Sequence, residues 1–506
     1  MTERVGIIDL GSNSARLIVM NIYYNGSYNL VYHQKESIRL SEGMSNTNRL
    51  QPSAMERAVT TLSTFSHMCE LFGATKIIAV TTAAVRNAVN GPDFLRLVQN
   101  QTSIPLQVIS GEEEAYLGYI GTINTLDTPD ALIFDLGGAS TELTLVRDRK
   151  LAHALSLPFG AVTLSEKFQT HDKISEDRLT ELYNYIMRQL ETIPWLEKMQ
   201  LPLIGIGGTM RNVAKMDQRV RNYPFTKVHN YKIGTLSFAG LWRSLVEKSA
   251  DQRRKIPGLS SDRADLIVAG TTIIKCLLAA TRGTQLIVSG CGVREGLFFR
   301  YYLQQHQMPD IIPDIVMHSA RNMLMFFKGN VGHADHVVSL TSAMFDGWQT
   351  LHGLGSREKI LLQVAALLHD IGISINYYDH ARHSSYLVEN ARLFGLTHRE
   401  QMLCAVIAGW HNGVTAKFTR NRLYSEFLDE GDWSTARKLA LLLALAECLD
   451  TSQMQLIGSV KASAEGKKGL LTVTGNADAS LELRSAAKLG KWFKKEFGLD
   501  LVIGRQ

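Results

Sequence analysis

The chain has 506 residues, of which 45% are hydrophobic and 20% are charged, and its formal net charge is +6. This balance is typical of a soluble globular protein, and the length predicts three or four domains. The longest apolar runs fall well short of the roughly 20 residues that a membrane span needs, so we expect no membrane partner. The five cysteines show no paired spacing and the first predicted strand begins almost at the N-terminus. We therefore expect a reducing, cytoplasmic location without a signal peptide or a disulfide framework.

The first 128 residues predict an α/β domain. Residues 5–10, 17–22 and 30–33 have the pattern of a three-strand meander, and apolar residues at intervals of four and three over 58–72 indicate an amphipathic helix. Two further strands, near 76–80 and 106–109, lead into a turn that carries Arg86 and into the acidic run Glu112–Glu114. Acidic residues favour the positive end of a helix dipole, which explains Glu112 and Glu113 without a function.

Residues 131–145, at the start of a predicted second domain (129–304), read as a strand, a glycine turn and another strand. The turn runs from Asp135 through Gly137 and Gly138 to Glu142. Successive N–H groups in such a turn can form an anion-binding nest, and glycine lets the backbone approach a ligand closely. Two carboxylates beside a phosphate-sized nest are consistent with a bridging Mg²⁺. An ordinary glycine-rich hairpin is the alternative.

The same pattern occurs 126 positions earlier, where Asp9, Gly11 and Ser14 correspond to Asp135, Gly137 and Ser140. A repeat at this distance predicts two similar domains, each of which offers a turn to a shared cleft. Residues 203–209 and 286–292 are again an apolar strand followed by a glycine-rich turn. Together these four segments resemble the actin-like fold of sugar kinases, chaperone ATPases and polyphosphate phosphatases.

The chain changes character after residues 304–314, which contain two prolines and two acids and are predicted as a linker. Helical patterns rich in Leu, Ala and Met then run to about residue 450, and the last fifty residues combine short alternating segments with a basic helix. The sequence therefore predicts a helical domain over 305–452 and a small α/β domain over 453–506.

The order of these motifs is similar to the exopolyphosphatase and guanosine-pentaphosphate phosphatase family over about the first 300 residues. The resemblance implies two tandem actin-like (ribonuclease H-like) domains, a hydrolase acting on phosphoanhydride bonds, and a homodimer. It places the catalytic base on Glu114 and Mg²⁺ on Asp135 and Glu142. Ala139 stands where the family usually has a third glycine, although its N–H is still available. The implied phosphate-binding residues are Ser12, Asn13, Ser14, Arg86, Gly137, Gly138, Ala139, Ser140, Gly207, Gly208 and Thr209.

Three functional alternatives remain open at this point. An actin-like kinase or ATPase would need an adenosine pocket in the second domain. Within the phosphatase family, inorganic polyphosphate needs a basic track, whereas guanosine pentaphosphate needs a base pocket. Basic residues are in excess over 211–232 and over 457–506, which favours polyphosphate, although solvated surface explains such runs equally well. No nucleic-acid partner is expected.

The predicted helical domain contains histidine and aspartate residues in an order that resembles the HD phosphohydrolase superfamily. Histidine and carboxylate ligands from facing helices can form a cage for a second divalent transition metal. The alternative is a structural, dimerising domain that retains the signature. His380 and His398 are predicted as ordinary surface histidines. The ligands implied by the resemblance are His336, His369, Asp370, His383, His411 and Asp450.

Overall fold

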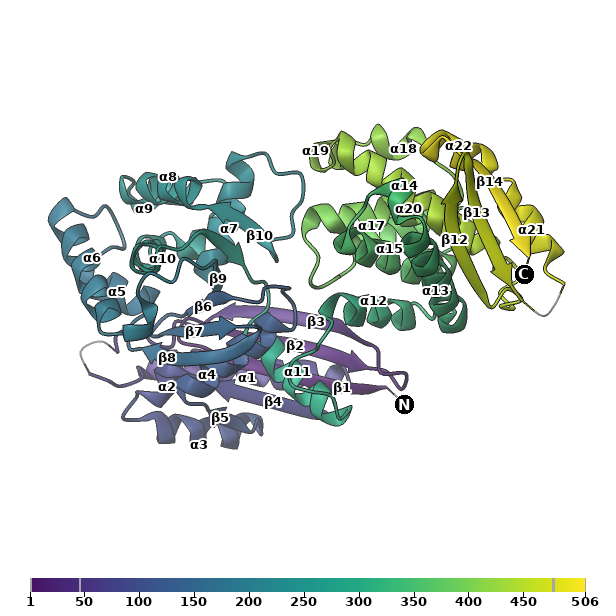
Figure 1. The fold of residues 1–506 in the computed structure, drawn as a ribbon. Helices are drawn as coiled ribbons and strands as arrows, with labels where there is room; N and C mark the ends of the chain where they lie inside the picture. Colours follow the sequence, from purple (N-terminus) through teal and green to yellow (C-terminus); the bar gives the residue numbers. More distant parts are fainter. Residues whose placement is uncertain (1, 45–46, 476–477, 506) are drawn as a thin grey trace. The chain divides into compact units, whose positions relative to one another are not determined.

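The computed structural model describes residues 2–44, 47–475 and 478–505, apart from the side chain of Lys417. The chain forms two compact units, one that extends to Tyr24 and resumes over Tyr28–Pro313, and one made of Asn25–Ser27 and the residues from Asp314 onward (Figure 1). The first unit ends within the predicted linker, after the expected boundary at residue 304. No described helix is long and apolar enough to cross a bilayer.

Unit 1 contains two sheets with the same strand order. In the first sheet the order is β3-β2-β1-β4-β5, and in the second it is β10-β11-β9-β6-β7-β8, so that β8-β7-β6-β9-β11 repeats the first. Each repeat is an antiparallel meander extended by parallel strands. The strands are β1 (Glu3–Leu10), β2 (Ser14–Ile22), β3 (Tyr28–Ser37), β4 (Lys76–Thr81), β5 (Leu106–Val108), β6 (Ala131–Leu136), β7 (Thr141–Arg147), β8 (Lys150–Leu157), β9 (Leu203–Ile206), β10 (Tyr231–Gly234) and β11 (Gln285–Val288).

Helices connect and cover these strands, as Figure 1 shows. Helix α6 (Glu176–Glu191) is followed by a short 3₁₀ turn over Pro194–Leu196, which the proline begins. Helix α10 (Ile267–Thr281) begins after a 3₁₀ turn over Ser261–Arg263. The helices of unit 1 are α1 (Pro52–Leu71), α2 (Ala83–Arg86), α3 (Gly91–Thr102), α4 (Gly111–Ile123), α5 (Ala161–Phe168), α6 (Glu176–Glu191), α7 (Gly208–Val220), α8 (Thr235–Val246), α9 (Ala250–Arg254), α10 (Ile267–Thr281) and α11 (Val293–Gln305).

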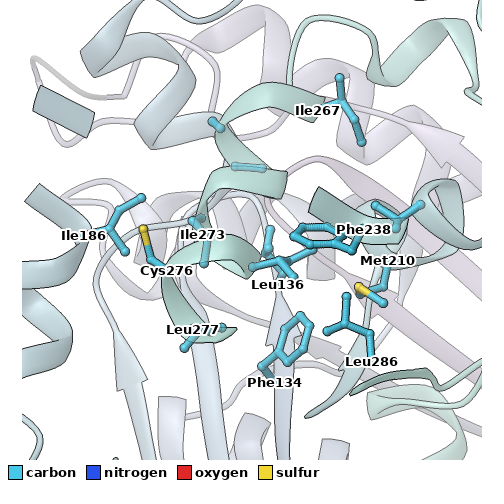
Figure 2. Close-up of a cluster of buried hydrophobic side chains, with 14 of the residues drawn as sticks. Phe134, Leu136, Ile186, Met210, Phe238, Ile267, Ile273, Cys276, Leu277 and Leu286 are labelled. Carbon is cyan, nitrogen blue, oxygen red and sulfur yellow. The ribbon is translucent and has the colours of Figure 1, made fainter. Parts of the chain in front are cut away.

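A continuous apolar core fixes the second sheet and the turns at its strand ends (Figure 2). Phe134 and Leu136 alternate with Asp135 along β6, so their side chains enter the core while the carboxylate lies on the other face. Met210 from α7 and Leu277 from α10 contribute to the same core. Burial of one large apolar side chain contributes about 1.5–3 kcal/mol, so β6 is held firmly up to the glycine turn that follows it.

Unit 2 combines the predicted helices with the predicted small sheet in one body. The indole N–H of Trp348 donates to the Ser463 carbonyl oxygen at 2.8 Å, and the rings of Trp348 and Phe493 lie 5.0 Å apart. The strand order is β12-β13-β14. The elements are α12 (Ile315–Phe326), α13 (Val331–Gly347), α14 (Gln349–His352), α15 (Ser356–Leu368), η3 (Ile371–Ser374), α16 (His380–Asn390), α17 (His398–Trp410), α18 (Ala416–Thr419), α19 (Arg422–Phe427), α20 (Glu430–Cys448), β12 (Ser459–Glu465), β13 (Lys468–Thr474), α21 (Ser480–Ala487), α22 (Gly490–Phe497) and β14 (Asp500–Arg505).

Candidate functional site

Turns from both sheets of unit 1 line one polar cavity of about 100 Å³. Ten of the residues predicted to act at the first site contribute to its wall. They are Ser12, Asn13, Ser14, Glu114, Asp135, Gly137, Gly138, Ser140, Gly207 and Gly208. The repeated motifs of the sequence therefore meet at one place, as the shared-cleft hypothesis requires.

The two hairpin turns have the same internal hydrogen bond and nearly touch each other. Gly11 N–H donates to the Ser14 carbonyl oxygen at 3.1 Å, and Gly137 N–H donates to the Ser140 carbonyl oxygen, also at 3.1 Å. A Cβ atom added to Gly138 would lie 3.1 Å from the Ser12 Cβ, so a side chain here would crowd the facing turn. The close approach of the two turns leaves room only for small or narrow groups between them.

A third wall of the cavity is the N-terminus of α7. Gly207 precedes this helix with φ of 99°, a left-handed conformation that favours glycine, and a Cβ there would lie 2.8 Å from the Leu136 carbonyl oxygen. The helix begins at Gly208, which also lines the cavity. The N-terminal N–H groups of a helix and its dipole favour a bound anion, so this wall suits a phosphoryl group.

Four predicted residues lie outside the cavity wall. Ala139 sits in the turn between two wall residues, and Thr209, which follows the wall residue Gly208, is buried with its side chain facing Gly270. Arg86 is paired with Glu114 at 3.3 Å and donates to the Ile109 carbonyl oxygen at 2.9 Å, so it holds Glu114 rather than facing the open space.

Glu142, the fourth, lies directly across the hairpin from Asp135. Its Oε1 accepts a hydrogen bond from the Ser156 hydroxyl at 2.8 Å, but its Oε2 is buried without a hydrogen bond. Burial and then the nearby Asp135 raise the pKa of Glu142 to about 7, and burial and then Asp9 raise the pKa of Asp135 to about 6. A buried carboxyl oxygen without a donor, next to a second carboxylate, fits a hard divalent cation.

Glu114 lies in the first turn of α4, which the Ser110 hydroxyl caps by accepting from Glu113 N–H. The carboxyl group is buried at the cavity wall. Burial, followed by the charges of Glu142 and Asp135, raises the pKa of Glu114 well above its ordinary value, while Arg86 opposes this shift. A carboxylate with a raised pKa is a better proton acceptor near neutral pH than an ordinary glutamate.

Four arginines that were not among the predicted site residues also line the cavity: Arg16, Arg211, Arg263 and Arg294. Arg16 faces Asp9 across β1 and β2 in the register position that Glu142 occupies opposite Asp135. The duplication therefore supplies a cation in one hairpin and a carboxylate in the other. The repeat itself, extended two residues beyond Ser14, would have indicated Arg16. Burial lowers the pKa of Arg211 to about 10, which leaves it charged at neutral pH.

The basic stretch that begins at Arg211 divides between the cavity and the surface. Arg211 lines the cavity, whereas Arg219 and Lys232 are exposed and Arg221 is paired with Asp217 at 3.0 Å. One residue of the predicted basic track is therefore part of the site. A guanidinium group gives a fork of N–H donors that matches phosphate oxygens.

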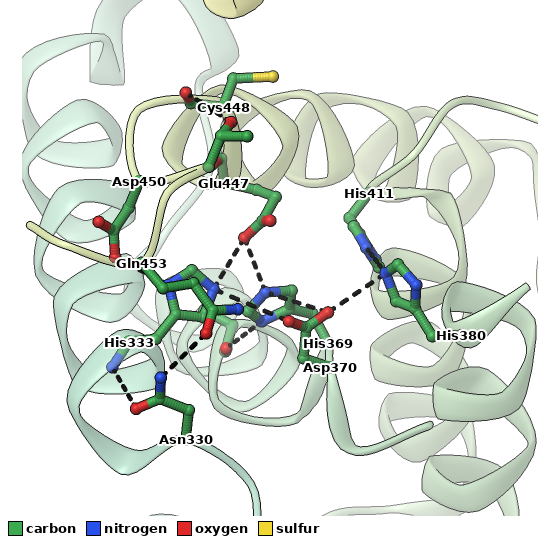
Figure 3. A network of polar contacts seen from close by, with 12 residues as sticks. Asn330, His333, His369, Asp370, His380, His411, Glu447, Cys448, Asp450 and Gln453 are labelled. Carbon is green, nitrogen blue, oxygen red and sulfur yellow. Dashed lines mark hydrogen bonds and ion pairs between the residues drawn. The ribbon is translucent and has the colours of Figure 1, made fainter. Parts of the chain in front are cut away.

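Unit 2 contains a separate cluster of potential metal ligands (Figure 3). Among the described residues, two groups have ligand atoms that all lie within 4.8 Å of one another. The first group is His333, His369, Asp370 and Glu447, and the second is Asp370, His380 and His411. Asp370 belongs to both groups.

This cluster differs from the ligand set that the HD resemblance implied. His369, Asp370 and His411 are in it, but His336 and His383 belong to neither group, and their places are taken by His333 and His380. Asp450 does not face the centre of the cluster. Its Oδ2 instead lies 2.8 Å from His333 Nδ1, while Glu447 provides the facing carboxylate. The prediction that His398 is a surface histidine is wrong, because it is 5% exposed, and His380 is only partly exposed.

Electrostatics within the cluster are strongly coupled. Burial would lower the pKa of His333, but hydrogen bonds with Asp450 and Glu447 raise it to about 10. Burial would raise the pKa of Glu447, but hydrogen bonds with His333 and His369 lower it well below its usual range. Burial, and then the charge of His369, lowers the pKa of His411 to about 4. At neutral pH the carboxylates therefore favour a positive charge on His333, whereas the imidazole of His411 is neutral.

The duplicated sheets, with a polar cleft lined by turns from both, define an actin-like fold. Residues 19–305 match the model of the Ppx/GppA phosphatase family, and residues 315–485 match domain III of the same family. The chain therefore belongs to the Ppx/GppA phosphatase family. Membership makes it a hydrolase that acts on phosphoanhydride bonds.

Solved structures support the same fold. A Ppx/GppA family member from Aquifex aeolicus is 27% identical with a TM-score of 0.53, and the match covers 60% of this chain and 99% of that chain. A second structure of the Aquifex aeolicus enzyme is 27% identical with a TM-score of 0.51, covering 59% and 99%. An exopolyphosphatase from Cytophaga hutchinsonii is 24% identical with a TM-score of 0.55, covering 61% and 99%.

Proposed function

We propose that the cleft of unit 1 releases terminal orthophosphate from inorganic polyphosphate. The observation that carries this proposal is the character of the cavity, which is small, polar and rich in backbone N–H groups and arginines. No aromatic side chain is among the described residues that line it. A narrow, cationic cavity favours a chain of phosphoryl groups over a purine base, which needs apolar or aromatic contact.

In this proposal Glu114 is the catalytic base. Its carboxylate accepts a proton from a water molecule, and the water oxygen forms a bond to the terminal phosphorus as the bridging anhydride bond breaks. The electron pair of that bond stays on the new terminal oxygen of the shortened chain. The turn N–H groups and the guanidinium groups of Arg16, Arg211 and Arg294 neutralise the charge on the phosphoryl oxygens. Arg86 positions Glu114 through their ion pair.

Asp135 and Glu142 are the residues that we propose to hold Mg²⁺. The buried Oε2 of Glu142 without a hydrogen bond and the raised pKa values of both carboxyl groups fit this role. Magnesium is usually held by one or two carboxylates, with substrate phosphates and waters completing its shell. When bound, it would neutralise phosphoryl charge during transfer to water.

The decisive experiment is a phosphate-release assay on polyphosphates of several lengths, guanosine pentaphosphate and ATP. We expect Glu114→Gln to lower phosphate release from polyphosphate by about 100-fold or more while chain binding is retained. The matched control is Glu112→Gln, which removes an exposed carboxylate from the same helix turn and leaves activity unchanged. Full activity of Glu114→Gln would remove the base assignment.

Guanosine pentaphosphate is the alternative substrate within the same family. Its terminal phosphate could enter the same cavity while the nucleoside remains outside. A preference for guanosine pentaphosphate with no dependence on polyphosphate chain length would replace polyphosphate as the proposed substrate. Transfer of phosphate from ATP to an acceptor alcohol, without release to water, would support the kinase class instead.

A further inference from the structure

Arg263 lines the cleft of unit 1 and has two acidic neighbours in the sequence, Asp262 and Asp265. Its guanidinium group lies against the start of α7, because a Cβ added to Gly208 would lie 2.7 Å from Arg263 Nη2. The group is therefore beside the helix N-terminus that suits a phosphoryl group. Among the described residues Arg263 forms no ion pair, because both neighbouring acids have other partners.

Those partners are basic side chains from the other repeat of unit 1. Lys35 Nζ, on β3, lies 2.9 Å from Asp262 Oδ2, and Arg39, which follows β3, places Nη2 3.2 Å from Asp265 Oδ2. Strand β3 belongs to the first sheet, whereas residues 262–265 lie between β10 and β11 of the second sheet. The two ion pairs thus connect the two repeats whose turns line the cavity.

The backbone that carries Arg263 is fixed independently of these ion pairs. Asn212 Oδ1, from α7, accepts from the Ser260 N–H at 2.8 Å and from the Ser260 hydroxyl at 2.9 Å. The Ser165 hydroxyl donates to the Asp265 carbonyl oxygen at 3.0 Å. Loss of an ion pair would therefore change which partners the side chains take, while the course of the chain stays the same.

Arg39 is held in position by the first glycine turn. The N–H groups of Ile38 and Arg39 both donate to the Asn13 carbonyl oxygen, at 3.1 and 3.0 Å. Arg39 has φ of 46°, a left-handed conformation that an arginine adopts only at a cost. The two hydrogen bonds maintain this conformation. A residue of the turn that lines the cavity therefore fixes the backbone from which Arg39 reaches Asp265.

The two acids lie close enough to Arg263 to attract it. Burial lowers the pKa of Arg263, and the charges of Asp262 and Asp265 oppose this shift. Burial would raise the pKa of Asp262, but the hydrogen bond and the charge of Lys35 lower it. Lys35 thus satisfies a carboxylate that would otherwise need another cation.

Asp265 has the stronger need for its partner. Its side chain is 25% exposed, against 33% for Asp262, and its Oδ1 is buried without a hydrogen bond. A buried carboxylate without a cation is costly, so the loss of Arg39 would favour rotation of Arg263 towards Asp265. A guanidinium group that is paired in this way has fewer donors left for a phosphoryl group.

We propose that Lys35 and Arg39 are positioning residues, which keep Arg263 free to bind phosphoryl oxygens of the substrate. They do so by pairing with the two acids beside it. Because these pairs join the two repeats, closure of the cleft and availability of Arg263 are coupled, and a substrate that binds Arg263 favours the closed arrangement. The inference rests on hydrolysis of a phosphoanhydride in this cleft and is independent of which phosphoanhydride the chain prefers.

The main test compares variants at Arg39 and Asp265 by steady-state phosphate release from polyphosphate with the full-length chain. Arg39→Asn removes the cation and keeps a residue that tolerates positive φ. We expect it to raise KM about tenfold, since the substrate loses a hydrogen bond with a charged group, and to leave kcat nearly unchanged. Asp265→Asn should have a KM close to that of the unsubstituted chain, because Arg263 then has no competing carboxylate at this position.

The double variant Arg39→Asn/Asp265→Asn distinguishes this role from a structural one. We expect it to recover the KM of Asp265→Asn. If the ion pair only held the two repeats together, either single substitution would have the same effect, because each removes the same contact, and the double variant would be no better than either. Arg39→Lys keeps the cation and should retain most of the affinity.

Lys35→Met, Asp262→Asn and their double variant should give the same pattern with a smaller rise in KM, because Asp262 is the more exposed acid. The matched control is Lys76→Met, which removes an exposed lysine of β4 that is not among the described residues of the cavity wall. Its KM should not change. Thermal unfolding of every variant shows that the comparison is made between folded proteins.

Two results overturn the proposal. One is an unchanged KM in Arg39→Asn, and the other is a double variant Arg39→Asn/Asp265→Asn that is no better than Arg39→Asn. A chain that hydrolyses guanosine pentaphosphate but not polyphosphate would contradict the substrate proposed above, and the same comparison of variants then uses guanosine pentaphosphate. Failure of the positioning role and failure of the proposed substrate are therefore distinguishable.

Discussion

Glu142 is a buried carboxyl group whose ionisation is unfavourable because it lies next to a second carboxylate. Its Oε2 has no hydrogen-bond donor, and it faces Asp135 across the hairpin. The pKa of Glu142 is raised to about 7 by burial and by Asp135. When the pKa of a carboxyl group is higher in the folded than in the unfolded chain, its contribution to stability is fully present at pH values below the unfolded pKa. This contribution is lost as the pH rises through the folded pKa.

We therefore predict that Glu142→Gln stabilises the metal-free protein at pH 8 and has little effect at pH 4.5. The difference at pH 8 is on the order of 3 kcal/mol, because one pKa unit corresponds to about 1.4 kcal/mol. Thermal unfolding in a chelator at the two pH values measures it.

Addition of Mg²⁺ at pH 8 should raise the Tm of the unsubstituted protein and not that of Glu142→Gln, while phosphate release by the variant falls at least tenfold. The control Glu112→Gln should follow the unsubstituted protein, and an Mg²⁺ response in Glu142→Gln would contradict the assignment.

The residues that sequence reasoning predicted for the first site and that line the cleft of unit 1 share one property. The turn residues that follow Asp9 and Asp135 are fixed by local hairpin geometry, so a repeated motif is enough to predict both the strands and the side of the sheet on which the turns lie. Arg263 lies far along the chain from these turns and reaches the cavity through tertiary packing alone. No local pattern marks such a residue.

At the scale of the element, the helices of unit 2 place the potential ligand cluster close to, but not on, the residues that the HD resemblance implied. The structure selects His333 instead of His336, His380 instead of His383, and Glu447 instead of Asp450 as the group that faces the cluster. Each difference is three residues, which is close to one helical turn. Residues at i and i+3 lie on the same helix face. The resemblance therefore implied residues within about one helical turn of the cluster, and the packing of the helices decides which residue faces it.

The contact between α4 and α11 joins two elements that carry the active cleft. Helix α4 holds Glu114 in its first turn, and α11 begins at Val293, directly before Arg294. A Cβ on Gly296 would lie 2.0 Å from the Leu117 carbonyl oxygen, and one on Gly121 would lie 2.2 Å from the Gly292 carbonyl oxygen. Because both obstacles are backbone atoms, the two helices can approach this closely only with glycine at both positions.

Gly296→Ala should accordingly destabilise unit 1 by about 2 kcal/mol and lower phosphate release, since it separates α4 from α11. Gly240→Ala in α8 is the matched control, because a Cβ there meets nothing within 4 Å. Alanine has the higher helix propensity, so this control should stabilise the protein by about 0.5–1 kcal/mol. Denaturant unfolding and the phosphate assay measure both effects. Equal stability changes in the two variants would contradict the proposed close contact.

At the scale of the whole molecule, the end of unit 1 is fixed by hydrogen bonds beyond the last helix turn of α11. Asn124 is 1% exposed and pairs with both sides of this segment, since its Nδ2 donates to the Asp310 carbonyl oxygen and its Oδ1 accepts from Ile312 N–H, each at 2.8 Å. Arg149 donates to the carbonyl oxygens of Ile312 and Pro313 at 2.8 and 3.3 Å. Residues 305–313 therefore belong to unit 1, although their composition resembles a linker.

A fragment of residues 1–313 should consequently be more stable than one of residues 1–304. The shorter fragment leaves the buried amide of Asn124 without two partners, and an unpaired buried polar group costs about 1–3 kcal/mol. We expect its unfolding midpoint to be lower by several degrees. Asn124→Ala in the longer fragment should reproduce most of this loss without removing any chain, which separates the hydrogen bonds from the effect of length.

Both fragments contain every described residue of the cleft. The longer one should therefore release phosphate from short polyphosphate with the Glu114 dependence of the full chain, and equal midpoints for the two fragments would show that residues 305–313 do not stabilise unit 1.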